Sequence, residues 1–321
     1  MSEFFCVAIT DCEFSSIEPE VQELAGLATV SKYSCRNEED VIDAAKDADA
    51  IIVQYAPISR RVIQALTRCK VIARYGVGVD MIDLEAASER GILVANVPDY
   101  CQEEVSDHTV ALILASCRRI VQLHTSVNGG TWDFSAGGPI RRIRDLVVGL
   151  ISFGRIAVRV AEKLAAFGCQ LMAFDPYIDP KIARHHGVTQ VGLAALLATA
   201  DVVSVHAPLT EATHHMIGYE ELRSMKENAF VINTSRGAVI DQEALETALD
   251  EGLIAGAALD VLEHEPIQAG SRLLGCSNVI LTPHAAFYST DSLRELQVRT
   301  ARGVAEALRG EVPEGVVNRL P

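Results

Sequence analysis

The sequence predicts an α/β fold with two domains, and three observations support this prediction. Short apolar runs typical of buried strands recur along the chain, separated by stretches with helical periodicity. The runs are apolar on both faces, as in parallel sheets that helices cover on each side. The chain has 321 residues, which suits two domains of about 150 residues each.

Strand-like runs occur in both halves of the chain. The expected strands span residues 5–9, 50–54, 71–74, 92–95, 147–151, 170–174, 202–205, 230–233, 255–259 and 279–281. The final helix is expected at about residues 292–309, after the last of these strands, and we expect it to fold back on the first half.

The boundary between the domains is expected near residue 100, because only the second half contains a strand followed by a Gly-containing turn and an amphipathic helix. A long helix is expected to begin after Asp99, a residue typical of N-caps, and to bridge the two domains. Its apolar positions keep a helical period: Val105, Leu112, Ala115 and Ile120. We assign residues 1–99 and 291–321 to one domain and residues 100–290 to the other.

Residues 128–139 interrupt this alternation with four glycines around Trp132 and Phe134. An irregular arm with exposed aromatic side chains is expected there. Two interpretations stay open, a surface for a homodimer and a packed surface loop.

Composition excludes several classes of protein. The 28 Lys and Arg against 43 Asp and Glu leave a net charge of −15, which repels nucleic acid. The best charge-free apolar run, residues 109–117, is far shorter than the ~20 residues that cross a bilayer. Residues 1–10 lack the pattern of a signal peptide. The eight cysteines form no C-x-x-C pair, so we expect reduced, mostly buried thiols in a soluble, cytoplasmic protein without a membrane partner.

A dinucleotide-binding pattern follows the expected strand at 147–151. The turn reads Ser152-x-Gly154-x-x-Ala157 and opens a helix that includes Arg155 and Ile156. Ala at the third position still lets helix and strand approach, but Ser152 replaces the usual first glycine and predicts a shifted turn. Asp175 ends the next strand about 20 residues further on, where a carboxylate accepts hydrogen bonds from a ribose diol and selects NAD over NADP. Alternatively, Asp175 is a turn residue before Pro176.

Three charged or titratable residues stand at or after the ends of strands in the second half. They are Arg236, Glu265 and His284. Because the carboxyl ends of parallel strands line one crevice, all three can converge on one pocket. Arg stabilises a developing oxyanion and grips a carboxylate, and a carboxylate beside an imidazole favours its charged, proton-donating form. The alternatives are a surface Arg, a packing His and a solvated Glu.

The chain resembles the D-isomer-specific 2-hydroxyacid dehydrogenase family over essentially its whole length. The segments that carry the resemblance are residues 75–80, 149–157, 175–177, 206–210, 233–237, 259–266 and 282–286. The resemblance implies two Rossmann-like, doubly wound domains, an NAD-binding one inserted in a substrate-binding one, and a homodimer. It also implies that Arg236 binds the substrate, that His284 is the acid/base and that Glu265 is its partner.

Further site residues follow from the same resemblance. The backbone at Val77 and Gly78 is implied to hold the substrate's carboxylate, and Phe287 to pack over its side chain. The implied additional cofactor contacts are Thr109, His206, Ala207, Thr234 and Asp260. For His206, simple packing is an equally weighted alternative.

No metal is expected. The adjacent pairs His185-His186 and His214-His215 are unsuited to chelation, because neighbouring residues on a helix or strand point in different directions.

Three functions remain open. The first is an NAD-dependent oxidoreductase of a small 2-keto or 2-hydroxy acid. The stretch 285–289 resembles the C-terminal binding protein branch of the family, which implies an NADH-sensing regulator as the second. A short-form phosphoglycerate dehydrogenase is the third.

Overall fold

The computed structural model describes residues 4–320. The chain divides into two compact units: the residues up to Tyr100 together with those from Ser289 onward, and Cys101–Tyr288. Each contains one parallel sheet, five-stranded in the first unit and seven-stranded in the second. The predicted α/β class with two doubly wound sheets is confirmed.

The first unit has the strand order β2-β1-β3-β4-β5, which is that of flavodoxin-like sheets. Its strands are β1 (Phe5–Ile9), β2 (Ala28–Lys32), β3 (Ala50–Val53), β4 (Val71–Arg74) and β5 (Leu93–Ala95). Strand β2 is absent from the prediction, because it lies at the sheet edge with alternate residues exposed and so forms no apolar run.

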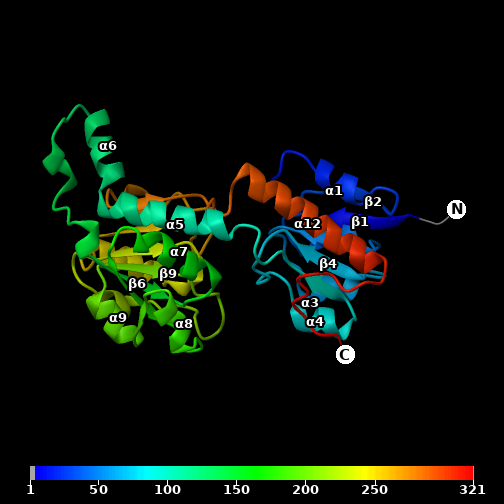
Figure 1. Cartoon of the computed structure of the whole chain (residues 1–321). Helices are drawn as coiled ribbons and strands as arrows, with labels where there is room; N and C mark the ends of the chain where they lie inside the picture. The colour runs from blue at the N-terminus through cyan, green and yellow to red at the C-terminus, as the bar shows by residue number, and fades with distance from the viewer. Residues whose placement is uncertain (1–3, 321) are drawn as a thin grey trace. The chain divides into compact units, whose positions relative to one another are not determined.

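Helices cover both faces of this sheet. They are α1 (Glu18–Glu23), α2 (Glu38–Ala45), α3 (Arg60–Ala65), α4 (Leu84–Glu89) and α12 (Thr290–Leu308). The first residues of α2, α3 and α4 are capped by Asn37, Ser59 and Asp83, whose side chains accept backbone hydrogen bonds. Helix α12 packs against α1, β3 and β4 (Figure 1), so the predicted return of the last helix to the first half is confirmed.

The second unit has the strand order β12-β11-β10-β9-β6-β7-β8. Counted from β6, its first six strands follow the order of a dinucleotide-binding sheet, with the change of direction between β6 and β9. The strands are β6 (Val147–Ile151), β7 (Gln170–Phe174), β8 (Thr189–Gln190), β9 (Val202–Val205), β10 (Phe230–Asn233), β11 (Gly256–Leu259) and β12 (Val279–Leu281). All but the two-residue β8 were predicted, with ends that differ by at most one residue.

Two apolar clusters cover the two faces of the seven-stranded sheet. Helices α5 (Gln102–Cys117), α7 (Arg155–Ala165) and α8 (Pro180–His185) pack on one face, through residues such as Ile113 and Leu164. Helices α9 (Leu193–Thr199), α10 (Tyr219–Arg223) and α11 (Gln242–Asp250) pack on the other, through residues such as Leu197 and Leu245. The helices packed on its two faces hold the sheet in place. The polar loops at the carboxyl ends of the strands remain available to form a site.

The structure differs in two respects from the prediction of a long helix after Asp99. Cys101, not Asp99, precedes α5, while Oδ1 of Asp99 lies 2.8 Å from Nη1 of Arg299. The helix also ends at Cys117, because Arg119 adopts a left-handed φ of 54° that starts the separate helix α6 (Ile120–Asn128). A helical period continues across such a break, so the period alone could not reveal it.

Helix α6 and the arm that follows it, residues 129–139, extend away from the seven-stranded sheet (Figure 1). A short 3₁₀ turn, η1 (Phe134–Gly137), packs against α6. The side chains of Trp132 and Phe134 are each 90% exposed. The prediction of exposed aromatic residues on this arm is confirmed, and that of a packed loop is wrong for these two side chains.

All eight cysteines are free thiols. Only Cys35, Cys101 and Cys117 are buried, so the expectation of mostly buried thiols is wrong. Within residues 4–320, no helix combines the length and the apolar character that crossing a bilayer requires.

Candidate active site

The turn between β6 and α7 has the features of a dinucleotide site. Helix α7 begins after Gly154 with no side chain capping its first turn, so its first backbone N–H groups point to where a pyrophosphate binds. A Cβ at Gly154 would meet nothing within 4 Å, and Gly154 and Arg155 are exposed. The turn is therefore open to a ligand that approaches the backbone. Asp175 lies at the end of the neighbouring strand β7, so the residues present fit NAD.

Ser152 changes this turn in a way the motif alone did not show. It has a left-handed φ of 69°, which costs a non-glycine residue about 1–2 kcal/mol. Its hydroxyl donates to Oδ2 of Asp175 at 3.2 Å, and the N–H of Phe153 donates to the same oxygen at 2.8 Å. The predicted shift of the turn is thus seen as a strained backbone at Ser152. The same residue hydrogen-bonds to Asp175, the carboxylate expected to bind the ribose.

Replacing Ser152 by Gly should leave the Kd for NADH equal to or below that of wild type. Glycine removes the strain and frees one lone pair of Asp175, while the lost hydrogen bond costs about 1 kcal/mol. Fluorescence titration with NADH measures the Kd. Ser152→Ala is the matched control, because it also removes the hydroxyl but keeps the strain. A marked loss of affinity in both variants would show that the hydroxyl itself contacts NADH.

His284 and Glu265 form a close pair in the second unit. Nδ1 of His284 lies 2.7 Å from Oε2 of Glu265. Burial alone would raise the pKa of Glu265, but the hydrogen bond and charge of His284, the N–H of Leu262 and the charge of Arg236 together lower it. Glu265 is therefore an acceptor, and Nδ1 of His284 carries a proton. This leaves Nε2 as the ring nitrogen that can exchange a proton with a substrate.

Asp260 positions the loop that carries His284. Its Oδ1 accepts hydrogen bonds from the hydroxyl of Thr282 at 2.6 Å and from the N–H of Ala285 at 2.9 Å, and its Oδ2 accepts from the N–H of Ala286 at 2.9 Å. The carbonyl of Asp260 accepts from the N–H of His284 at 2.8 Å. These bonds hold His284 at a left-handed φ of 52°. Asp260 was expected only as a cofactor contact, and nothing in the sequence pattern indicated this second role.

His108 also reaches this loop, and the prediction did not include it. Its Nε2 lies 3.0 Å from the hydroxyl of Thr282 and 3.5 Å from Oδ1 of Asp260. Helix α5 is thereby connected to the His284 loop.

Arg236 follows β10 and precedes the 3₁₀ turn η3 (Gly237–Val239). Its carbonyl accepts a hydrogen bond from the side-chain amide of Asn233 at 2.9 Å, and its Nη1 donates to the carbonyl of Ser235 at 2.8 Å. Its charge contributes to the lowered pKa of Glu265. The second unit therefore brings together the charges of Arg236, Glu265 and His284.

Gly237→Ala should lower both Tm and kcat. A Cβ on Gly237 would lie 1.9 Å from the carbonyl carbon of Leu262 and 2.3 Å from the nitrogen of Glu263. The backbone leading to Glu265 would have to move, and overpacking of this kind costs about 1–3 kcal/mol. A displacement of about 1 Å at a reacting group can cost 10²-fold in rate.

Thermal unfolding and steady-state kinetics measure the two effects. Gly270→Ala is the control, because a Cβ there meets nothing within 4 Å. Wild-type Tm and kcat in Gly237→Ala would contradict the close packing of these two segments.

The remaining cofactor candidates lie near the ends of β9 and β10. The hydroxyls of Thr109 and Thr234 are 2.7 Å apart. Thr109 has no exposed surface, so it cannot contact a ligand directly. Its hydroxyl instead positions Thr234 through their hydrogen bond. Burial lowers the pKa of His206 to about 4, which keeps its ring neutral beside the hydroxyl of Ser204 at 3.0 Å. Ala207 is buried next to it.

The substrate candidates are divided between the two units. Val77 and Gly78 follow β4 in the first unit, and the carbonyl of Val77 accepts from the side chain of Asn96 at 2.6 Å. Among residues 4–320, no backbone carbonyl accepts a hydrogen bond from the N–H of Val77 or Gly78. In the second unit, the rings of Phe287 and His284 meet edge to face with centroids 6.3 Å apart.

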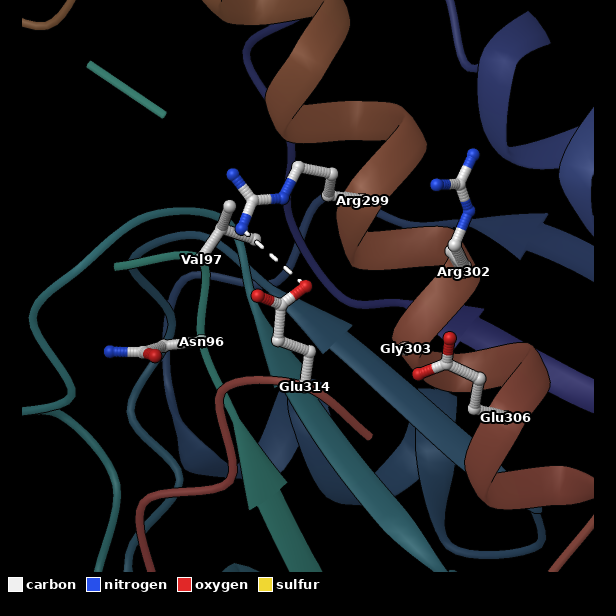
Figure 2. Close-up of a pocket in the computed structure, with 7 residues that line it drawn as sticks. All are labelled: Asn96, Val97, Arg299, Arg302, Gly303, Glu306 and Glu314. Atoms are coloured by element: carbon white, nitrogen blue, oxygen red, sulfur yellow. Dashed lines mark ion pairs between the residues drawn. The ribbon is translucent and has the colours of Figure 1, made fainter. Parts of the chain in front are cut away.

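A hollow in the first unit is a poor alternative site. Figure 2 shows its lining: Asn96, Val97, Arg299, Arg302, Gly303, Glu306 and Glu314. Arg299 faces three carboxylates, of Asp99 at 2.8 Å, Glu295 at 2.9 Å and Glu314 at 3.8 Å. With its charge neutralised in this way, the hollow does not favour an organic acid.

Comparison with known proteins decides the family. Residues 110–286 match the model of the NAD binding domain of D-isomer specific 2-hydroxyacid dehydrogenases. A glyoxylate reductase of Korarchaeum cryptofilum is 39% identical over 283 residues, covering 87% of this chain and 85% of that protein. The chain belongs to the D-isomer specific 2-hydroxyacid dehydrogenase family. It is an NAD-dependent oxidoreductase, and the prediction of this family, enzyme class and cofactor is confirmed.

Other members of the family differ in length and in the activity for which they are named. A D-3-phosphoglycerate dehydrogenase of Methanocaldococcus jannaschii is 38% identical over 94% of this chain, which spans 57% of that protein. The structure of a D-lactate dehydrogenase of Aquifex aeolicus in complex with NAD and lactic acid matches with a TM-score of 0.88 at 30% identity, covering 95% of this chain and 96% of that one.

Proposed function

We propose that this dehydrogenase reduces a small 2-keto acid to the D-2-hydroxy acid with NADH, using Arg236, Glu265 and His284. The observation that carries the proposal is the 2.7 Å pair of His284 with an ionised Glu265, within the field of Arg236. A cation and a proton donor are what the carbonyl oxygen of a keto acid needs as it becomes an alkoxide.

Arg236, Glu265 and His284 have different roles in this reaction. NADH, when bound, supplies the hydride. Arg236 binds the carboxylate and the keto oxygen through its planar guanidinium and stabilises the charge that develops on the oxygen. His284 donates the proton from Nε2, and Glu265 orients the ring through Nδ1 and stabilises its charged form. In the reverse direction, neutral Nε2 accepts the proton of the hydroxyl group.

The other candidates bind and orient the two ligands. Val77 and Gly78 offer backbone N–H groups to the substrate's carboxylate, and Phe287 packs against its side chain. Gly154, Arg155 and Ile156 hold the pyrophosphate at the start of α7, next to Ser152. Asp175 binds the adenosine ribose. The residues that line the nicotinamide half of the cofactor site are His206, Ala207, Thr234 and Asp260, with Thr109 in support.

The activities for which relatives are named favour an enzyme with a small substrate. The Korarchaeum relative is a glyoxylate reductase, and the Aquifex relative is a D-lactate dehydrogenase whose structure holds NAD and lactic acid. Neither the short-form phosphoglycerate dehydrogenase nor the NADH-sensing regulator is favoured.

A steady-state screen tests the proposal. Glyoxylate, pyruvate and 3-phosphohydroxypyruvate are each offered with NADH and with NADPH. Turnover above ~1 s⁻¹ with at least one acid is expected, given ordinary kcat values, and NADH should be preferred. Negligible turnover with every acid alongside tight NADH binding would favour the sensor.

The assembly and location are part of the same proposal. The exposed Trp132 and Phe134 on the arm after α6 are suited to covering a second copy of the chain, giving a homodimer. Sedimentation of wild type and of the Trp132→Ser, Phe134→Ser double variant tests this, with dissociation expected only in the variant. The free thiols and the net charge of −15 suit a cytoplasmic enzyme without nucleic-acid or membrane partners.

A further inference from the structure

Three side chains able to bind a metal meet on the surface of the second unit. They are His214, His215 and Glu263, and one ligand atom from each lies within 4.8 Å of the others. Nε2 of His215 is 2.9 Å from Oε1 of Glu263. We propose that this cluster binds a divalent transition-metal ion, for which Zn²⁺ is the probe.

The two histidines face the same way because of an unusual backbone. The prediction that adjacent histidines point apart assumes a helix or strand, but His215 lies in a turn with a left-handed φ of 51°. Its N–H donates to the carbonyl of Ala238 at 2.8 Å, which holds the turn in place. The rings of His214 and His215 therefore stack, with centroids 3.9 Å apart and planes at 25°.

The pair His185-His186 behaves as the prediction expected. Its rings are 5.1 Å apart and nearly perpendicular, at 84°. Nδ1 of His186 lies 3.2 Å from Oε1 of Glu162. Within residues 4–320, this pair and its carboxylate are not among the groups whose ligand atoms converge. It is therefore a natural control.

Neighbouring groups orient the two less exposed ligands. Oε2 of Glu263 accepts the N–H of Gln242 at 3.3 Å, so Oε1 is the oxygen turned to His215. Oδ2 of Asp241 lies 3.8 Å from Nδ1 of His215, and Oδ1 of the same residue caps α11 by accepting from the N–H of Ala244 at 3.0 Å. A carboxylate behind the second ring nitrogen is the usual support of a metal-binding histidine.

The donor set selects the kind of ion. Two imidazoles and one carboxylate suit Zn²⁺, Ni²⁺ or Cu²⁺, whereas Mg²⁺ and Ca²⁺ prefer oxygen ligands alone. Bonds of about 2.0–2.2 Å to each ligand require Nε2 of His215 and Oε1 of Glu263 to separate to about 3.3 Å in a tetrahedral site. His214 is exposed and can turn its ring out of the stack until a nitrogen points at the ion. Water would complete the coordination.

The cluster is linked to the segments that carry the proposed catalytic residues. His215 hydrogen-bonds to Ala238, two residues after Arg236, and Glu263 lies two residues before Glu265. An ion bound here would link the segment that follows Arg236 to the segment that precedes Glu265, without contacting either residue. Because it binds the folded chain, it should also raise the Tm.

Isothermal titration of the chelator-treated full chain with Zn²⁺ tests the proposal. One equivalent should bind to wild type, and the affinity should fall by at least about 10-fold in His214→Ala and about 100-fold in His215→Ala and Glu263→Gln. Asp241→Asn should weaken binding by about 10- to 100-fold, as for other supporting carboxylates. The double control His185→Ala, His186→Ala should bind like wild type.

Two further measurements keep the test decisive. His214 is exposed, so His214→Ala should fold normally even if His215→Ala does not, and NADH affinity checks the fold of each variant. Co²⁺ in place of Zn²⁺ should give a visible spectrum without a thiolate charge-transfer band. No stoichiometric binding to wild type, binding unchanged in His214→Ala and Glu263→Gln, or a thiolate band would overturn the proposal.

Discussion

His284→Ala should lower kcat for keto-acid reduction by about 10²- to 10⁴-fold, the usual contribution of a general acid, while the Kd for NADH stays unchanged. The expectation rests on the orientation of His284: its Nδ1 lies 2.7 Å from Oε2 of Glu265, so Nε2 is the ring nitrogen assigned to proton transfer. Steady-state kinetics and NADH titration separate the two effects. His185→Ala, an exposed histidine on α8, is the control and should match wild type.

The companion variant Glu265→Gln gives the pH dependence. The pKa of Glu265 is lowered, so this carboxylate stays ionised at neutral and mildly acidic pH, and its support of His284 is lost only as the pH falls through that lowered value. Reduction needs protonated His284 and should slow as pH rises, whereas oxidation should slow as pH falls. In Glu265→Gln the ionised carboxylate beside the imidazole is lost, so both pH profiles should differ from those of wild type. Identical profiles in the variant would contradict the pairing.

Arg236→Gln should lower kcat/KM for the keto acid by about 10³-fold, which corresponds to about 4 kcal/mol of transition-state stabilisation. The guanidinium provides both the charge near Glu265 and a fork for the carboxylate. Arg236→Lys should recover only a small part of the loss, because an ammonium keeps the charge but not the planar fork.

The exposed Arg184 on α8 provides the control for these variants. Arg184→Gln removes the same charge from the second unit and should leave kcat/KM unchanged. A full recovery of activity in Arg236→Lys would mean that charge alone matters at this position. Wild-type kinetics in Arg236→Gln would remove Arg236 from the substrate site.

Local sequence patterns predicted most of the fold because buried strands are continuous in sequence. Both sheets follow from apolar runs such as Val147–Ile151 and Phe230–Asn233, which are fully or almost fully buried. Edge strand β2 was not predicted because its residues are only partly buried, and an apolar run marks only strands that are buried. The break between α5 and α6 was not predicted either, since one left-handed residue, Arg119, leaves the hydrophobic period intact.

Sequence patterns proposed residues for the candidate site but could not give their geometry. The spacing of Gly154 and Asp175 indicated the dinucleotide site, but the hydrogen bond from Ser152 to Asp175 depends on a backbone torsion that no motif contains. In the same way, the left-handed His284 is held by Asp260, and the left-handed His215 brings two rings together. Tertiary hydrogen bonds impose these torsions, so a single-sequence pattern cannot report them.

The most direct test of the proposed mechanism is a crystal structure of the enzyme with NADH and oxamate, an unreactive analogue of a 2-keto acid. We expect the carboxylate of oxamate on the guanidinium of Arg236 and the N–H groups of Val77 and Gly78, with its carbonyl oxygen at hydrogen-bond distance from Nε2 of His284. The adenosine ribose should contact Asp175. Oxamate bound away from His284 and Arg236, with NADH in place, would contradict the assignment of these residues.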